Sequence, residues 1–280
     1  MGLTPAQRLL LFTYDRDLPL DPHGGAIAEA EGVRSERFSF ASTHGQRVPA
    51  VLCRPQTAPA PLPVLVVGHG AGASKDDPVM QALFRHWAGA GFACLAIDAP
   101  FHGERAGRRV DPTALLRRPY AGMHLVQQAV VDTRRAVDWA ETRPDLDAAR
   151  LAYVGFSMGT ILGVQFVAME PRVRSAVFAL GGAGLLHYLA ALAPAEARPD
   201  AETVADACDP MHYAPLIAPR PVLMVNGLKD EVIPPALGHM LYNSLNEPRR
   251  AIWYDGGHGD IPHAHLQAMR EFLLETLRPA

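Results

Sequence analysis

Short, wholly apolar runs recur along this chain, and a longer segment with helical periodicity separates each run from the next. Such runs are typical of strands buried on both faces, as in a parallel sheet. Alternating strands and helices predict βαβ units, so we expect an α/β fold with a mostly parallel central sheet covered by helices on both faces. The predicted strands are residues 64–67, 92–97, 151–154, 173–180, 222–225 and 251–254.

The segments between these runs place apolar residues at helical spacing. One example is Val79, Leu83, Phe84 and Trp87, which recur three or four residues apart. The predicted helices are residues 79–90, 123–141, 157–169, 235–245 and 264–277. Two further runs, residues 37–41 and 48–54, predict a hairpin that turns at His44-Gly45.

The domain organisation follows from the segments in which predicted strands and helices do not alternate. Prolines and Gly24-Gly25 interrupt residues 1–34, which we expect to be an irregular N-terminal extension packing on the core. Residues 35–280 then form one α/β domain. Within it, residues 182–215 contain four prolines between two predicted strands, which indicates a small cap insertion.

Composition excludes several classes of protein. The net charge of −3 gives no electrostatic reason to expect binding of nucleic acid or of an anionic membrane. Three cysteines are too few for a disulfide scaffold, and no apolar run reaches the length of a membrane span. We therefore expect a cytoplasmic protein. The twelve histidines remain open as metal ligands, catalytic bases or surface residues.

The most specific motif is Gly155-Phe156-Ser157-Met158-Gly159, which stands between a predicted strand and a predicted helix. This G-x-S-x-G pattern is typical of a nucleophile elbow, a tight turn that exposes a serine hydroxyl at the end of a strand. The helix that follows places positive potential near an oxyanion. Ser157 is therefore the predicted nucleophile, against the alternative of a glycine-rich turn with an incidental serine.

A serine nucleophile needs a base, and the base needs an orienting acid. Asp230 and His258 each follow the end of a predicted strand, in the order Ser, Asp, His that accompanies this elbow. They are the predicted acid and base. The competing residues are Glu231, Asp255 and Asp260 for the acid, and His263 and His265 for the base.

Two backbone N–H groups are expected to form the oxyanion hole. One belongs to Met158, the residue after the nucleophile, and the other to the glycine-rich loop after residues 64–67. In that loop we predict Ala71, with Gly70 and Gly72 as alternates. His69 is interpreted as a structural histidine that hydrogen-bonds the same loop.

Over residues 35–278 the chain resembles the α/β-hydrolase superfamily, and within it the serine esterases similar to dienelactone hydrolase and to prolyl oligopeptidase. The resemblance rests on the elbow and on four other motifs, which are His69-Gly70, residues 98–105, Gly227-x-x-Asp230 and Gly257-His258. It implies an α/β-hydrolase fold with Ser157 as nucleophile, His258 as base and Asp230 as its orienting acid. Dienelactone hydrolase itself uses a cysteine nucleophile, so Ser157 shifts the expectation from lactones to carboxylic esters.

We therefore predict a carboxylesterase that cleaves small-molecule esters with small to medium acyl chains through an acyl-enzyme. No cofactor and no metal are expected, and the oligomeric state is open, a homodimer included. Tyr188 and Met211 of the predicted cap, and His102 in the loop after residues 92–97, are candidate substrate-binding residues.

Other interpretations of the motifs stay open. A peptidase or an acyltransferase would use the same triad, and a non-catalytic binding protein would keep the fold alone. Residues 68–73 fit a loose dinucleotide-binding pattern, but Asp76 and Asp77 would stand where a pyrophosphate binds. A zinc site at His258, Asp260, His263 and His265 lacks the H-E-x-x-H pattern, and Pro262 divides the group.

Overall fold

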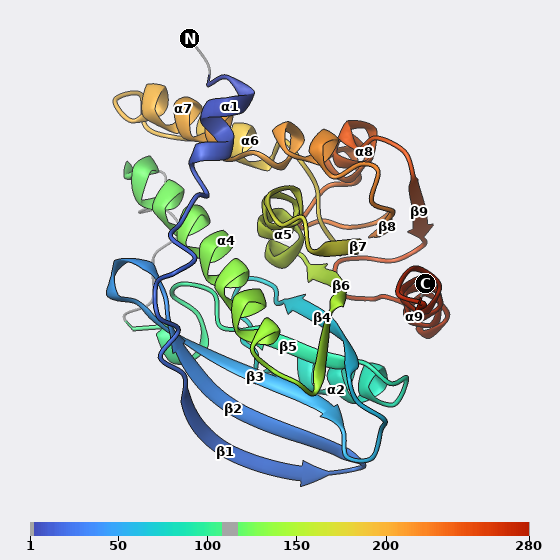
Figure 1. The fold of residues 1–280 in the computed structure, drawn as a ribbon. Helices are drawn as coiled ribbons and strands as arrows, with labels where there is room; N and C mark the ends of the chain where they lie inside the picture. Colours follow the sequence, from blue (N-terminus) through green and yellow to red (C-terminus); the bar gives the residue numbers. More distant parts are fainter. Residues whose placement is uncertain (1–2, 108–116, 280) are drawn as a thin grey trace.

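A computed structural model describes residues 3–107 and 117–279 (Figure 1). In these ranges the strands form one nine-stranded sheet, in the order β1-β2-β3-β5-β4-β6-β7-β8-β9. The strands are β1 (His23–Ala30), β2 (Val33–Ala41), β3 (Arg47–Pro55), β4 (Leu62–Gly68), β5 (Ala93–Ile97), β6 (Leu146–Phe156), β7 (Val173–Ala179), β8 (Val222–Gly227) and β9 (Arg249–Tyr254).

The sheet is parallel from β5 through β4, β6, β7 and β8 to β9. β1, β2 and β3 add an antiparallel edge beside β5. The predicted strands and the predicted hairpin are confirmed. The apolar run 64–67 is buried at all four positions because helices cover both faces of the sheet there.

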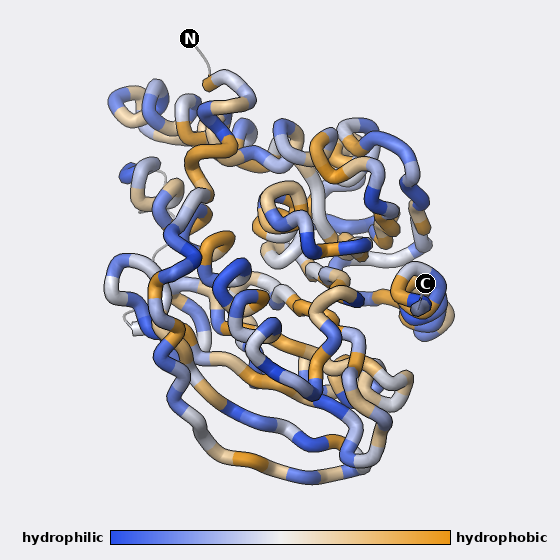
Figure 2. Tube along the Cα trace, in the orientation of Figure 1, coloured by the Kyte–Doolittle hydropathy of each residue, from blue (hydrophilic) through white to orange (hydrophobic). Residues whose placement is uncertain are grey.

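Helices cover the two faces of the sheet as predicted. The helices are α1 (Pro5–Leu10), α2 (Pro78–Ala88), α4 (Pro119–Glu141), α5 (Met158–Met169), α6 (Leu185–Ala191), α7 (Arg198–Cys208), α8 (Pro235–Ser244) and α9 (His263–Thr276). α2 and α9 pack on one face, and α4, α5 and α8 pack on the other. Figure 2 shows hydrophobic segments where these helices meet the sheet. In the described ranges, no helix combines the length and the apolarity needed to cross a bilayer.

The N-terminal segment is more regular than expected. Residues 23–30 form the edge strand β1, and the predicted boundary between residues 34 and 35 falls inside β2. The expectation of an irregular segment is therefore wrong. All eight residues of β1 are exposed, so no alternation of apolar and polar residues marked this strand in the sequence.

The same segment is attached to the core by side chains. The Phe12 ring is fully buried and lies 5.5 Å from the Tyr213 ring. The buried Arg135 of α4 donates hydrogen bonds to the backbone oxygens of Leu18 (2.6 Å) and Pro19 (3.1 Å). A buried guanidinium matched to carbonyl groups fixes the path of residues 12–19 across the core.

The insertion between β7 and β8 contains α6, α7 and two short 3₁₀ turns. Its two helices pack on each other, α7 packs on α4, and α1 lies beside them (Figure 1). Arg8 of α1 pairs with Asp206 of α7 at 2.8 Å. α1, α6 and α7 thus form one group of helices beside α4.

Candidate active site

Ser157 lies in the sharp turn between β6 and α5. Its backbone has φ 53° and ψ −116°, a region that non-glycine residues rarely adopt. Its N–H donates a hydrogen bond to the oxygen of Ala179 on the neighbouring strand, at 2.9 Å. Backbone strain of this kind persists where the surrounding structure holds it, and the Ser157 side chain makes no capping hydrogen bond to α5.

The turn depends on a close approach between α5 and two strands. A Cβ added to Gly159 would lie 2.3 Å from the carbonyl oxygen of Gly68 on β4. A Cβ on Gly155 would lie 2.5 Å from the carbonyl oxygen of Gly159. The buried Tyr153 hydroxyl donates to that same Gly159 oxygen at 2.6 Å. The glycines of the motif are therefore required by contact between backbones.

The three predicted triad residues meet at one edge of the sheet. The His258 Nε2 atom lies 3.0 Å from Ser157 Oγ, and its Nδ1 atom lies 2.7 Å from Asp230 Oδ2. Because a carboxylate only accepts, Nδ1 carries the proton, so Nε2 is the acceptor for the serine O–H. This arrangement joins loops that follow β6, β8 and β9.

The Asp230 carboxylate is fixed on both oxygens. The residue is 4% exposed, and Oδ1 accepts hydrogen bonds from the N–H groups of Val232 (2.9 Å) and Ile233 (2.8 Å). Oδ2 is left to face His258. These bonds hold the carboxylate in the orientation that an imidazole partner needs.

The competing residues lie elsewhere. Glu231 is exposed, Asp255 pairs with Lys229 at 2.7 Å, and Asp260 accepts a hydrogen bond from Gly257 within its own turn. His263 and His265 belong to α9 and make no hydrogen bond to Ser157 among the described residues.

The glycine-rich loop after β4 lies against Ser157. A Cβ added to Gly70 would lie 3.5 Å from the Ser157 Cβ, an ordinary van der Waals contact. The backbone N–H groups of Ala71 and Met158 donate no hydrogen bond within the described part of the chain. Free N–H groups on two segments beside a serine hydroxyl are the elements from which an oxyanion hole is built.

His69 has the structural role expected of it. Its Nε2 atom accepts a hydrogen bond from the N–H of Ala99 (3.1 Å), so Nδ1 carries the proton and donates to the oxygen of Gly70 (2.8 Å). The residue is 3% exposed, and burial lowers its pKa below the ordinary value of 6.5. A neutral imidazole thus joins the loops after β4 and β5.

A buried lysine strengthens the same junction. Lys75 Nζ lies 3.0 Å from Asp98 Oδ2 and also contacts Asp76 and Glu104. These bonds raise the pKa of Lys75, although burial alone would lower it. The sequence interpretation missed this pair. Its only signal is that Lys75 is one of two lysines in a chain that otherwise uses arginine.

The three residues predicted to bind substrate are less central. The His102 ring lies 5.2 Å from the His69 ring, and its Nδ1 atom is bonded to the oxygen of Pro100. Tyr188 is 60% exposed on α6, and Met211 packs against the main core. None of the three lines the two cavities described for this protein, and their assignment stays a prediction.

The geometry gives little support to a dinucleotide site or to a zinc site. After the glycine-rich loop, α2 begins only at Pro78, and Asp98 is occupied by Lys75. The segment therefore presents no helix N-terminus to a pyrophosphate at that loop. In the part of the chain that the structure describes, no three histidine, cysteine or acidic side chains converge on one point.

Known proteins share sequence and fold with this chain. A family model described as the dienelactone hydrolase family matches residues 48–259. An uncharacterized protein of Mycobacterium tuberculosis (strain ATCC 25618 / H37Rv) is 27% identical over 235 residues, which cover 79% of this chain and 73% of that protein.

Solved structures share the fold of this chain. Acetyl xylan esterase 1 from Thermoanaerobacterium sp. JW/SL YS485 matches with a TM-score of 0.78 and 22% identity, over 98% of this chain and 92% of that chain. A cold-adapted esterase from an Arctic intertidal metagenomic library matches with a TM-score of 0.72 and 21% identity, over 91% of this chain and 98% of that chain. At these identities the likeness concerns the fold alone, and the predicted α/β-hydrolase fold is confirmed.

Replacing Gly159 by alanine is expected to destabilise the protein. The new methyl group would collide with the Gly68 carbonyl, so α5 must move away from β4. We expect a loss of about 2–3 kcal/mol in the free energy of unfolding, measured by denaturant titration.

The matched control is Gly122→Ala on α4, where an added Cβ meets nothing within 4 Å. Alanine is the better helix former, so this change should leave stability equal or raise it by about 0.5–1 kcal/mol. Equal stability of the two variants would contradict the close approach described above.

His69 should remain neutral at a pH where an ordinary histidine is already charged. Because its pKa is lowered from 6.5 on folding, the unfolded chain takes up a proton first as the pH falls. The stability contributed by neutral His69 is therefore present above pH 6.5 and is lost between 6.5 and its lower folded pKa. NMR titration of its imidazole C–H signals, assigned with His69→Gln, measures this pKa. A midpoint at or above 6.5 would show that the His69–Ala99 bond does not hold in solution.

Proposed function

This chain belongs to the dienelactone hydrolase family of α/β-hydrolases, and we propose that within this family it is a serine hydrolase of carboxylic esters. One observation carries the proposal: His258 lies within hydrogen-bond distance of both Ser157 Oγ and Asp230 Oδ2. A base placed between a nucleophile and an orienting acid is the arrangement needed to activate a serine hydroxyl.

The proposed reaction begins with attack of Ser157 Oγ on the ester carbonyl. His258 Nε2 takes the serine proton as the C–O bond forms, and Asp230 stabilises the resulting imidazolium. The N–H groups of Met158 and Ala71 bind the negative charge that develops on the carbonyl oxygen. The tetrahedral intermediate then collapses, and His258 returns the proton to the departing alcohol.

Water completes the cycle. His258 removes a proton from a water molecule as its oxygen attacks the acyl-enzyme, and the proton returns to Ser157 Oγ as the acid product leaves. Every proton and electron pair in this sequence is supplied by the ester, the water or the triad, so no cofactor enters the reaction.

Several features support esters with small to medium acyl groups. Ser157 replaces the cysteine expected in a dienelactone hydrolase. The cap helices α6 and α7 have only 7 and 11 residues, which is short for a lid over a long acyl chain. Structural neighbours named as esterases agree with this class of reaction.

The first test is covalent labelling of Ser157. A fluorophosphonate should label the wild-type protein and Ser244→Ala, whose serine lies on α8, but not Ser157→Ala. The rate of p-nitrophenyl acetate hydrolysis should fall by about four orders of magnitude or more in Ser157→Ala, since loss of a serine nucleophile removes most of the catalysis. Undiminished labelling of that variant would exclude Ser157 as the nucleophile.

The same assays separate the alternative functions. A protein that is labelled but does not hydrolyse p-nitrophenyl esters would indicate a peptidase or an acyltransferase. A protein that is neither labelled nor active would indicate a binding protein with this fold.

The second test concerns the acid. Asp230→Asn should lower kcat by about 10³–10⁴, because an amide in this position favours the wrong imidazole tautomer. Glu231→Gln, at the exposed neighbour, should leave kcat within about twofold, as is usual for a surface change. Steady-state kinetics on p-nitrophenyl acetate compares the two variants. Greater damage from the Glu231 change would assign the acid to Glu231.

A further inference from the structure

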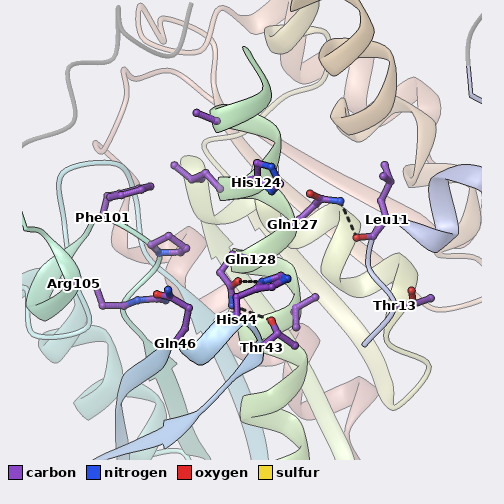
Figure 3. A pocket seen from close by; sticks show the side chains of 14 residues that line it. Leu11, Thr13, Thr43, His44, Gln46, Phe101, Arg105, His124, Gln127 and Gln128 are labelled. Atoms are coloured by element: carbon purple, nitrogen blue, oxygen red, sulfur yellow. Dashed lines mark hydrogen bonds between the residues drawn. The ribbon is translucent and has the colours of Figure 1, made fainter. Parts of the chain in front are cut away.

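A large, half-open pocket lies at the edge of the sheet and takes no part in the triad. Its volume is about 840 Å³, within the usual range of sites for small molecules. In Figure 3, α4 forms its floor, the loop that carries Phe101 and Arg105 lies on one side, and Leu11 lies on the other. The N-terminal segment therefore supplies one wall of this pocket.

The strand register places the pocket beside the nucleophile. Ala96 of β5 and Val154 of β6 both pair with Val67 of β4, so they lie at one level across the sheet. Ser157 and Ala99 each follow three residues later. The loop after Ala99, which borders the pocket, therefore lies at the level of Ser157 and about 10 Å to its side, the width of two strand spacings.

Residues on one side of α4 line both a small cavity behind Ser157 and the large pocket. Ala129 and Thr133 line a cavity of about 30 Å³ together with Met158, directly behind the elbow. Leu125, one turn before Ala129 on the same side of α4, lines the large pocket. The pocket and the candidate oxyanion site thus lie on the same face of the sheet.

Phe101 presents an aromatic ring to this pocket under backbone strain. It has φ 65°, an unusual value for a bulky residue, and it is 49% exposed. The buried Lys75–Asp98 pair and the hydrogen bond from Arg105 to the Asp98 oxygen (3.1 Å) hold the loop in this conformation. Strain that the surroundings maintain, at an exposed aromatic ring, points to a ligand contact.

The polar groups of the pocket are mostly neutral. Gln127 donates to the Leu11 oxygen at 3.2 Å, which leaves its own amide oxygen available. His44 uses Nδ1 toward Gln128 at 2.9 Å, which leaves Nε2 available. Thr13, Thr43, Gln46 and His124 complete the set of polar side chains.

The charge in the described lining of the pocket is compensated by a neighbouring residue. Among the described lining residues, Arg105 alone has a permanent charge, and it pairs with the buried Asp132 at 2.7 Å. A charged ligand would therefore meet no uncompensated opposite charge. A wholly apolar ligand would leave amide and imidazole groups unpaired, which is costly.

We propose that this pocket binds the alcohol portion of the ester and that this alcohol is a neutral, polyhydroxylated ring such as a pyranoside. The proposal rests on the function proposed above, because the scissile carbonyl must lie at Ser157. The Phe101 ring faces the C–H groups of the sugar ring, while the Gln127 amide oxygen accepts a hydrogen bond from one hydroxyl and His44 Nε2 bonds another.

The kinetic test compares substrates of matched size. We expect monoacetates of methyl pyranosides to be hydrolysed with kcat/KM at least about tenfold above that of cyclohexyl acetate, which has the ring but no hydroxyls. Phe101→Ala and Gln127→Leu should each lower the ratio of pyranoside acetate to p-nitrophenyl acetate kcat/KM by about tenfold, mainly through KM. Phe101→Tyr, which keeps the ring, should retain the ratio.

The control is Gln267→Leu on α9, which lies on the opposite face of the sheet and lines neither cavity. It should change neither the hydrolysis of pyranoside acetate nor that of p-nitrophenyl acetate. Equal hydrolysis of pyranoside and cyclohexyl acetates, or an unchanged ratio in both pocket variants, would overturn the proposal.

A binding experiment separates failure of this proposal from failure of the proposed function. In Ser157→Ala, titration with methyl β-glucopyranoside should give saturable shifts of the His44 and His124 imidazole signals in NMR spectra. The same titration should be weaker when Phe101→Ala is added. If Ser157 is not labelled and no ester is cleaved, the esterase function fails, and the titration still decides the pocket. Absence of saturable shifts would exclude a sugar site here.

Discussion

The contact between the Gly68 carbonyl and the first turn of α5 determines the geometry of the whole catalytic edge. At this distance Gly159 cannot carry even a methyl group, so the packing of α5 on β4 constrains the turn at Ser157. The same contact sets the position of the glycine-rich loop, because Gly68 is the last residue of β4 before it. The proposed nucleophile and the proposed oxyanion donors thus depend on the same packing contact between Gly68 and Gly159.

Buried ion pairs and hydrogen bonds fix the next loop, which follows β5. Asp98 binds the Lys75 ammonium group and the N–H groups of Lys75 and Glu104. Arg105 then connects the Asp98 backbone to Asp132 on α4. Removing one partner from such a network leaves an uncompensated charge in the interior, which typically costs about 3–5 kcal/mol. These bonds tie the loop that holds Phe101 to β5 and to α4.

Much of the parallel sheet could be predicted from the sequence, because its strands are buried on both faces and consist of apolar residues. The meeting of Ser157, Asp230 and His258 could be predicted too, since each lies within four residues of the end of a strand and these strand ends meet at one edge. β1 could not, because none of its residues is buried and no pattern distinguishes it from a loop. The pocket could not either, since its walls come from residues around 11, 44, 101 and 125, which only the folded chain brings together.

The exposed edge strand β1 bears on how molecules of this protein meet one another. A bare edge strand presents free N–H and C=O groups on which a strand of another molecule can pair. Here the register with β2 shifts between Gly24 and Ile27, so the edge is irregular, and the Glu29 carboxylate near its far end pairs with Arg34 at 3.2 Å. A strand from a second molecule would lose hydrogen bonds at the shift. An irregular edge of this kind is less suited to pairing with a further strand than a regular one.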